Sequence, residues 1–338
     1  MIRASTQLLR IAVFVSLLHC KASFAAAASI DQNHNMKKND SNSNQMSTQK
    51  SFDGRKTISL AQARSIYDNF ALSGHVGGKD ASSGYGGPAV NALVSMAGFG
   101  TRGSDEESMD PIYHAGDDPQ NKVSTSVNQR VFDYGCGQGK LAEHVANTLI
   151  HSTSANSTSS SSIHWHGVDQ SSEMVLKFNQ RFQQHRHHQS ERQFKASCNL
   201  IKDGNPLHLL RTIPAKSYNR FISTYCLDLL CEKDIYDVLT LAEHILHPKG
   251  TMLLAGITYG YRDSFRTFWM TLAWEIMYRI RPDIVGGCRP QVLTPYLKEK
   301  GWEIERIERT MPNGFPWMVS EVISARPPQG RNAWGTSS

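Results

Sequence analysis

Long apolar runs, internal repeats and fibrous periodicities are missing from this chain of 338 residues. No apolar run reaches the roughly 18 residues of a membrane-spanning helix, which excludes a polytopic membrane protein. No collagen period, heptad array or solenoid repeat is present. Hydrophobic residues make up 39% of the chain and the mean hydropathy is −0.41. Because the polar excess is confined to 29–57 and 151–162, about 200 residues are left for one hydrophobic domain.

Cysteine pairs of the kind that build disulfide frameworks or zinc sites are also lacking. The chain has six cysteines, one of them in the first 28 residues, and none in C-x-x-C spacing. Cys136, Cys198 and Cys226 lie in or beside apolar runs, which predicts buried free thiols. We therefore expect neither a disulfide-stapled fold nor a bound metal.

A basic stripe that would bind nucleic acid is not found either. The formal net charge is +6, but three bases belong to the first 28 residues, which contain no acid, so the remainder carries +3. The other bases are scattered among acids, whereas phosphate binding requires them to gather on one surface. We expect no nucleic-acid partner; the oligomeric state is left open.

The first 28 residues have the layout of a secretory signal peptide. Two arginines, an apolar core at 11–18 and small residues at 22–28 follow one another in the required order. A buried N-terminal helix is the alternative, disfavoured because no amphipathic pattern is present. Residues 29–57 are predicted to be a disordered linker or a second targeting segment. We expect entry into the secretory pathway, a complex plastid or endomembrane lumen as destination, and no stable membrane insertion after leader removal.

The remaining chain divides into a region of lid type and a domain of alternating β-type and α-type runs. Residues 58–127 combine two short helical runs with a glycine-rich stretch. Residues 128–326 alternate strand and helix, with a flexible serine-rich insertion at 151–162 and a disordered tail at 327–338. This alternation predicts an α/β fold: a Rossmann-like, doubly wound seven-stranded sheet, mostly parallel. The last strand should be antiparallel because its link is too short for a crossover helix.

The strongest local signal is a glycine loop. An apolar run from Val131 ends in Asp133 and passes through Gly135, Gly137 and Gly139 into a helical run. Ligands of open α/β sheets bind at the carboxyl ends of the strands, where glycines let the backbone turn and approach a ligand. A dinucleotide-binding loop has the spacing G-x-G-x-x-G, whereas here the third glycine comes one residue early.

That pattern resembles motif I of the class I S-adenosylmethionine-dependent methyltransferases. Further likenesses to the family follow at later strand ends. The segment 167–171 ends a strand in Asp169, and the segments 202–204 and 223–225 follow the next two strands. The segment 246–251 resembles an L-x-P-G-G turn, with Lys249 in place of the first glycine. Together they cover about 130–325 and come closest to the small-molecule branch of ubiquinone- and menaquinone-pathway methyltransferases.

The resemblance implies S-adenosyl-L-methionine as cofactor and assigns residues to it. Asp133 would position the amino-acid end of the cofactor through the loop, Asp169 would hold the ribose hydroxyls and Asp203 would meet the adenine. The residues expected at the cofactor are Asp133, Gly135, Cys136, Gly137, Gly139, Asp169, Gln170, Asp203, Gly204 and Thr224.

No general base stands out in the sequence. The candidates near strand ends are Tyr225, Asp228, His208 and Tyr259, and packing or capping is the favoured alternative for each. The aromatic segment at 262–290 is either a core-facing helix or a lid over the acceptor.

The sequence therefore predicts an enzyme that transfers a methyl group from S-adenosylmethionine to a small, apolar or aromatic acceptor. The alternatives are an NAD(P)-dependent oxidoreductase on a Rossmann-like fold and a non-catalytic, cofactor-binding protein of the methyltransferase type. The glycine spacing disfavours the oxidoreductase.

Overall fold

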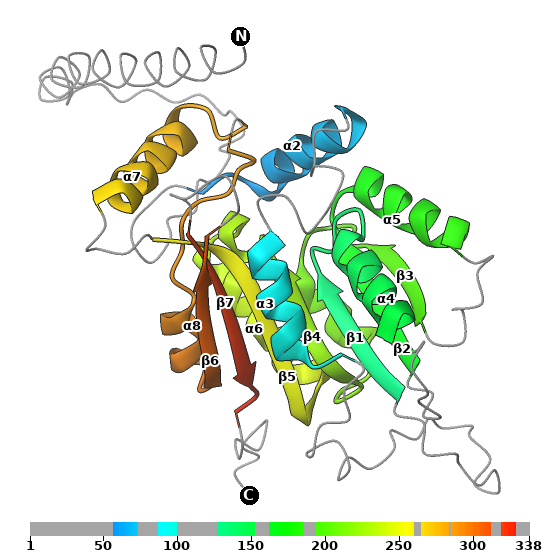
Figure 1. Ribbon diagram of the computed structural model, residues 1–338. Helices are drawn as coiled ribbons and strands as arrows, with labels where there is room; N and C mark the ends of the chain where they lie inside the picture. Colours follow the sequence, from blue (N-terminus) through cyan, green and yellow to red (C-terminus); the bar gives the residue numbers. More distant parts are fainter. Residues whose placement is uncertain are drawn as a thin grey trace, which may run out of the picture. The chain divides into compact units, whose positions relative to one another are not determined.

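A computed structural model describes residues 57–73, 87–99, 128–152, 162–185, 194–259, 265–283, 285–311 and 319–328 (Figure 1). Every described residue belongs to one compact unit within Thr48–Ser338. The predicted leader, the spacer up to residue 56, the centre of the serine-rich insertion and the end of the tail lie outside the described residues. No helix within those ranges is long and apolar enough to cross a membrane.

Seven strands form one sheet in the order β3-β2-β1-β4-β5-β7-β6. The strands are β1 (Asn128–Tyr134), β2 (Ser162–Asp169), β3 (Phe194–Leu200), β4 (Tyr218–Thr224), β5 (Leu246–Thr258), β6 (Glu303–Thr310) and β7 (Val319–Arg326). The first five pair in parallel, and β7 is antiparallel to both β5 and β6. The predicted fold class, including the antiparallel last strand, is confirmed.

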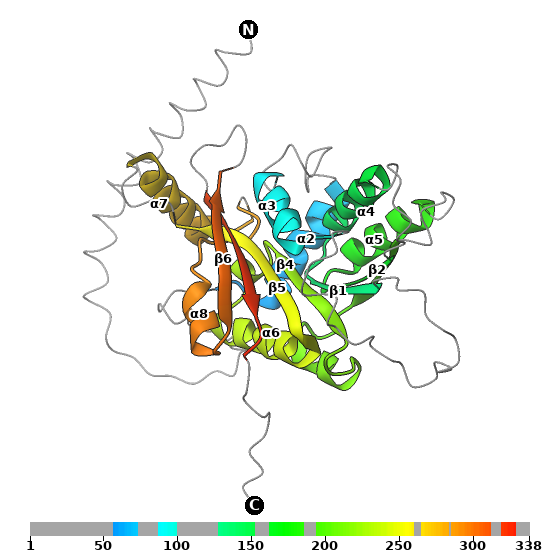
Figure 2. The same cartoon turned by 60° about the horizontal axis from the view of Figure 1, so that its bottom comes forward.

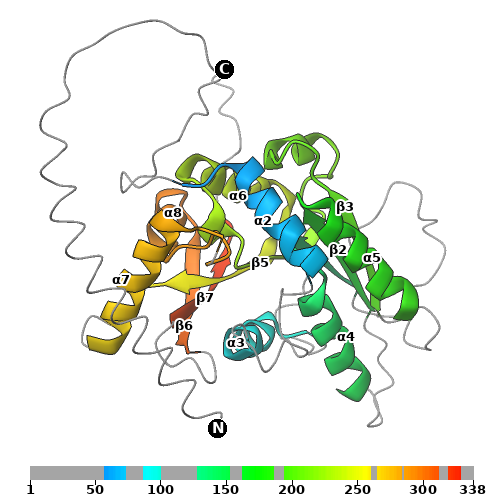
Figure 3. The same cartoon turned by 90° about the horizontal axis from the view of Figure 1, so that it is seen from above.

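Helices cover both faces of this sheet (Figure 3). They are α2 (Leu60–Ser73), α3 (Gly87–Ala97), α4 (Lys140–Ser152), α5 (Ser172–His185), α6 (Glu232–Ile245), α7 (Phe265–Ile280) and α8 (Thr294–Glu299), with the 3₁₀ turns η3 (Pro206–Arg211) and η4 (Leu227–Leu229). On one face, α3, α4 and α5 pack around Trp165 and Phe178. On the other, α6 and α8 pack around Phe132 and Phe221. The central strands are buried on both faces, as is usual for parallel sheets.

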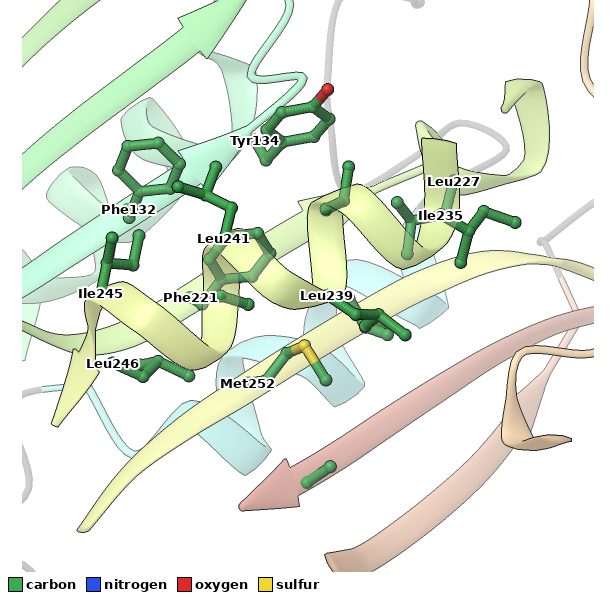
Figure 4. Close-up of a cluster of buried hydrophobic side chains, with 14 of the residues drawn as sticks. Phe132, Tyr134, Phe221, Leu227, Ile235, Leu239, Leu241, Ile245, Leu246 and Met252 are labelled. Atoms are coloured by element: carbon green, nitrogen blue, oxygen red, sulfur yellow. The ribbon is translucent and has the colours of Figure 1, made fainter. Parts of the chain in front are cut away.

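The core beneath α6 shows why these segments take their places (Figure 4). Alternate residues of a strand point to the same face, so Phe132 and Tyr134 of β1 meet Phe221 of β4. The apolar stripe of α6, including Leu239, closes over these rings. Truncating a buried ring such as Phe221 to alanine would cost about 3–5 kcal/mol.

The start of β5 differs from the sequence prediction. The strand begins at Leu246 rather than at residue 251, because Leu246 pairs with Tyr218 and the register then shifts, with Arg220 pairing to Thr251. The expected turn at 246–251 is therefore a bulge inside the strand. Gly250 is required there, since a Cβ would lie 2.9 Å from the carbonyl oxygen of His247.

Two helices lie beyond the carboxyl ends of the parallel strands instead of on a sheet face (Figures 1 and 2). Helix α2 is joined to the end of the sheet by Arg64, whose Nη2 donates to the carbonyl oxygen of Lys202 at 2.9 Å. Helix α7 is joined to the segment just before α2 by Tyr278, whose hydroxyl accepts a hydrogen bond from the Ile58 amide at 3.0 Å. Together they form a roof over the strand ends where the sequence places the glycine loop.

Candidate functional site

The glycine loop begins where β1 ends and has a backbone that favours glycine. Gly135, Gly137 and Gly139 have φ values of +73°, +53° and +77°, in the left-handed region. The amides of Gly135 and Cys136 both donate to the carbonyl oxygen of Val168, at 2.8 and 3.1 Å, which ties the loop to β2. The Glu143 amide donates to the Gly139 carbonyl at 2.9 Å, so the loop runs directly into α4.

The three glycines have different surroundings. A Cβ on Gly135 would lie 2.5 Å from the Cys226 sulfur, and one on Gly139 would lie 2.6 Å from the Phe178 ring. Both glycines are therefore required by packing within the protein. A Cβ on Gly137 would have nothing within 4 Å. Gly137 thus faces open space, as the centre of a ligand cradle should.

Asp169 fixes the open part of the loop from the end of β2. Its Oδ2 accepts from the Gly137 amide and its Oδ1 from the Ser171 amide, each at 2.9 Å. Burial raises the pKa of this carboxyl, and its backbone hydrogen bonds oppose the rise. Each oxygen keeps lone pairs for further donors such as ribose hydroxyls.

Asp133 lies in β1, two residues before the loop, and makes a different set of contacts. It is buried, and its Oδ2 accepts from the Trp165 indole at 3.1 Å, while Oδ1 has no hydrogen-bond partner among the described residues. Burial raises its pKa to about 7. The Asp133 side chain is therefore tied to β2 through Trp165.

Cys226 joins the loop to the end of β4. Its sulfur abuts Gly135, and its pKa is raised well above the usual value by burial and by the charges of Asp169, Asp228 and Asp133. Three acids therefore act on one thiol beside the loop. The thiol therefore stays protonated, and three carboxyl groups lie near it.

The strand order locates this place in the fold. From β1 the chain adds β2 and β3 on one side and then β4 and β5 on the other, so the order of strand addition switches between β1 and β4 while the strands stay parallel. Such switch points are where open α/β sheets bind ligands. Gly135 and Cys226 lie in contact at this point.

The other residues predicted at the cofactor are placed less uniformly. Gln170 lies beside Gly204, which has φ +65°, and a Cβ there would be 3.3 Å from the Gln170 Oε1 and 3.2 Å from Leu60 of α2. Asp203 is on the surface, with its side chain 69% exposed, and pairs with His208 at 3.2 Å. Thr224 is half-buried at the end of β4, and the thiol of Cys136 turns inward.

The four candidate bases divide into three places. His208 is exposed beside Asp203, and the Tyr259 hydroxyl donates to Glu275 of α7 at 3.0 Å. Tyr225 and Asp228 lie together under the roof: the negative charge of Asp228 contributes to the raised pKa of Tyr225. The structure therefore groups two of the four next to the glycine loop.

Beneath the roof is a set of aromatic and apolar side chains that the sequence did not single out as a group. We call it the roof cluster; it consists of Tyr67, Tyr225, Leu229, Ile257, Trp274 and Cys288. The Trp274 indole donates to the Cys288 carbonyl at 2.8 Å, and the Tyr67 hydroxyl lies 3.7 Å from the Cys288 sulfur. The sequence does not reveal the group, because its members come from α2, η4, β5, α7 and two connecting segments.

Helix α7 presents different side chains to the roof and to solvent. Trp274 and Tyr278 face α2 and the turn at 285–289, whereas Trp269 is 44% exposed. The side chains of Phe265 and Phe268 lie outside the described residues. Among the described residues, α7 contributes Trp274 to the roof cluster and no side chain to either of the two sheet cores.

No family model matches this chain, and no curated protein matches it. Several solved structures match it at low sequence identity. The [4+2]-cyclase SpnF has a TM-score of 0.51 and 15% identity, over 81% of this chain and 98% of that chain. This likeness shows the fold. Phosphoethanolamine N-methyltransferase 2 of Haemonchus contortus, solved with S-adenosylhomocysteine, has a TM-score of 0.48 and 14% identity, over 81% of this chain and 61% of that chain. Geranyl diphosphate C-methyltransferase of Streptomyces coelicolor, also solved with S-adenosylhomocysteine, has a TM-score of 0.42 and 11% identity, over 60% and 75%.

Proposed function

We propose that this protein is an S-adenosylmethionine-dependent methyltransferase that acts on a small, apolar or aromatic acceptor. The observation that carries the proposal is the cradle at Gly137. Its backbone is left-handed, faces open space and is held by Asp169 at the switch point of the sheet. The resemblance of the surrounding motif to class I methyltransferases supplies the identity of the ligand.

The charges of the site agree with that ligand and not with a dinucleotide. S-adenosylmethionine has a sulfonium, an ammonium and a carboxylate group and is a net cation, whereas NAD(P) brings an anionic pyrophosphate. Asp133, Asp169 and Asp228 all act on the pKa of Cys226 beside the loop, so each of these carboxyls that ionises adds negative charge near the ligand. Within the described residues, nothing favours the oxidoreductase alternative.

Each group of residues would have its own role in binding the cofactor or the acceptor. The methyl group of S-adenosylmethionine is already activated by its positive sulfur, so orientation is what the chain has to supply. Gly135, Gly137 and Gly139 would receive the amino-acid end, with Asp133 supporting the loop from below. Asp169 and Gln170 would bind the ribose, and Asp203 and Gly204 would border the adenine. The roof cluster would hold the acceptor against the reacting end.

The finer assignments are also proposals. We assign the chain to the small-molecule branch that includes quinone-pathway methyltransferases, on the resemblance of the motifs over about 130–325 taken together. The segments 58–127 and 262–290 would act as the lid, which the contacts between α2, Trp274 and the turn at 285–289 support. The leader at 1–28 would direct the chain into the secretory pathway, and N-terminal sequencing of the mature protein would test this.

Transfer of a labelled methyl group tests the activity. The purified protein would be incubated with methyl-labelled S-adenosylmethionine and a pool of small hydrophobic metabolites, and the label in extractable products would be counted. We expect transfer by the wild-type chain and its loss in Asp169→Ala. Tight S-adenosylhomocysteine binding without transfer to any fraction, protein included, would favour the non-catalytic alternative.

A further inference from the structure

Asp228 has the environment of a proton acceptor. It is 2% exposed, in η4, between the end of β5 and the turn at 285–289. Its Oδ2 accepts from the Ile257 amide at 3.2 Å, but its Oδ1 has no hydrogen-bond partner among the described residues. A buried acceptor without a partner is destabilising, and it is satisfied when a ligand brings a donor.

The roof cluster surrounds this oxygen with ring surfaces and apolar side chains. The charge of Asp228 contributes to the raised pKa values of Tyr67, Tyr225 and Cys288, which places all three near it. A Cβ on Gly256 would lie 3.7 Å from Oδ2, so glycine keeps this side of the carboxylate clear of a side chain. An aromatic acceptor with one polar donor matches these surroundings.

The backbone at Tyr225 and Cys226 places the roof cluster beside the glycine loop. Tyr225 has φ +51°, a strained value for a residue with a side chain, of the kind found at functional sites. Its amide donates to the Ala255 carbonyl at 2.7 Å and its hydroxyl lies 2.9 Å from Ser320 Oγ. Cys226, the next residue, contacts Gly135. Tyr225 in the roof cluster and Cys226 at the glycine loop are therefore adjacent in the chain, which places the proposed acceptor site beside the proposed cofactor site.

The charges facing Asp228 favour a neutral acceptor. Arg289 donates its amide to the Asp228 carbonyl at 3.2 Å, and its positive charge lowers the pKa of the Asp228 carboxyl. The other titratable groups facing Asp228 are Tyr67, Tyr225, Cys226 and Cys288, and burial keeps each of them protonated. Among these described groups, Asp228 is therefore the one that would take up a proton. The positive charge of Arg289 would repel an acceptor that carries an ammonium group.

We propose that Asp228 is the base for an aromatic hydroxyl acceptor, which makes the protein an O-methyltransferase. The inference rests on the proposed function. The acceptor oxygen forms a bond to the methyl carbon while the sulfur–carbon bond breaks and its electron pair stays on sulfur. The hydroxyl proton passes to Oδ1 of Asp228 and leaves to solvent with the product. Because α2 and the turn at 285–289 close over Asp228, the acceptor enters while they are apart.

The raised pKa of Asp228 suits this role. Burial raises it to about 7, so the carboxylate is strong enough to accept a phenolic proton and is largely ionised slightly above neutral pH. The rate with a hydroxyl acceptor should therefore rise with pH through that region.

The test compares Asp228→Asn with the wild-type chain, with Glu308→Gln as the matched control. Asparagine keeps the size of Asp228 and can still accept from the Ile257 amide. Glu308 is an acid of the edge strand β6, outside the proposed lid, and it pairs with Arg306. Calorimetry with S-adenosylhomocysteine comes first, and 2-naphthol and 2-naphthylamine then serve as probes that differ only in the acceptor atom.

We expect both variants to bind S-adenosylhomocysteine within about twofold of wild type. With 2-naphthol, Asp228→Asn should lose about 100-fold in kcat with little change in KM, while Glu308→Gln keeps wild-type rates. The rise of kcat/KM with pH should disappear in Asp228→Asn. As a readout without turnover, the absorption band of 2-naphthol bound to the S-adenosylhomocysteine complex should move to longer wavelength in wild type but not in Asp228→Asn.

Other results would overturn the inference. If 2-naphthylamine is the better substrate, if 2-naphthol fails to bind the complex, or if Asp228→Asn keeps its rate and pH profile, Asp228 is not the base for a hydroxyl. If the wild-type protein does not bind S-adenosylhomocysteine at all, the proposed function fails as well, which distinguishes the two failures.

Discussion

Replacing Gly137 with alanine separates ligand binding from folding at the glycine loop. The added Cβ would meet no protein atom within 4 Å, so the stability loss is only the strain of a left-handed alanine, about 1–2 kcal/mol. For a domain of this size, each 1 kcal/mol corresponds to roughly 2–4 °C in Tm. The methyl group would project into the space assigned to the ligand. We therefore expect the affinity for S-adenosylhomocysteine to fall at least tenfold, which is about 1.4 kcal/mol.

Gly139→Ala is the matched control for that variant. Its φ is also left-handed, but its Cβ would lie 2.6 Å from the Phe178 ring. Overpacking adds about 1–3 kcal/mol to the strain, so this variant should lose more stability than Gly137→Ala. Urea unfolding and calorimetry on both proteins measure the two effects. Wild-type affinity in Gly137→Ala, or a stability loss there as large as in Gly139→Ala, would refute the assignment of the open space to the ligand.

Four further outcomes are expected. Asp169→Ala should weaken S-adenosylhomocysteine binding by about 1–3 kcal/mol, because it removes the ribose contact and releases the Gly137 amide; unchanged calorimetric affinity would contradict this. Asp133 has its pKa raised to about 7 from 3.8, so the folded state favours its neutral form and stability falls as pH rises through that interval. Between pH 5 and pH 8, wild type should lose about 2–3 kcal/mol relative to Asp133→Asn in urea unfolding, and equal slopes would show that the carboxyl is not buried as described. For the same reason, S-adenosylmethionine should bind more tightly at pH 8 than at pH 6, and the neutral thioether S-adenosylhomocysteine should gain less in calorimetry. Trp274→Ala should alter kcat/KM for the acceptor more than Trp269→Ala, since only Trp274 belongs to the roof cluster; equal effects would argue against a lid.

The strands and helices were predictable because their signals are local. Short β-branched and aromatic runs alternating with amphipathic runs define β1 to β5. The brief link before β7 is sufficient to predict its antiparallel direction. The start of β5 was predicted too late, because the bulge at 246–251 depends on pairing with Tyr218, which no local pattern reveals.

The candidate site was predictable where glycine and acid spacing carries it, and much less so elsewhere. Motif spacing indicates Gly137 and Asp169, whose contact the structure shows. The proximity of Cys226 to Gly135 requires the strand order, although the position of Cys226 just after a strand end was a usable signal. The roof cluster is a product of tertiary packing alone, because Tyr67 and Cys288 are 221 residues apart in the sequence.

The most direct test of the account is one calorimetric comparison on the purified protein, with S-adenosylhomocysteine and NADPH titrated separately under the same conditions. We expect saturable one-site binding of S-adenosylhomocysteine and no heat of binding with NADPH. Binding of NADPH, or the absence of S-adenosylhomocysteine binding, would contradict the claim that the glycine loop, Asp169 and the acids around Cys226 form a methyl-donor site.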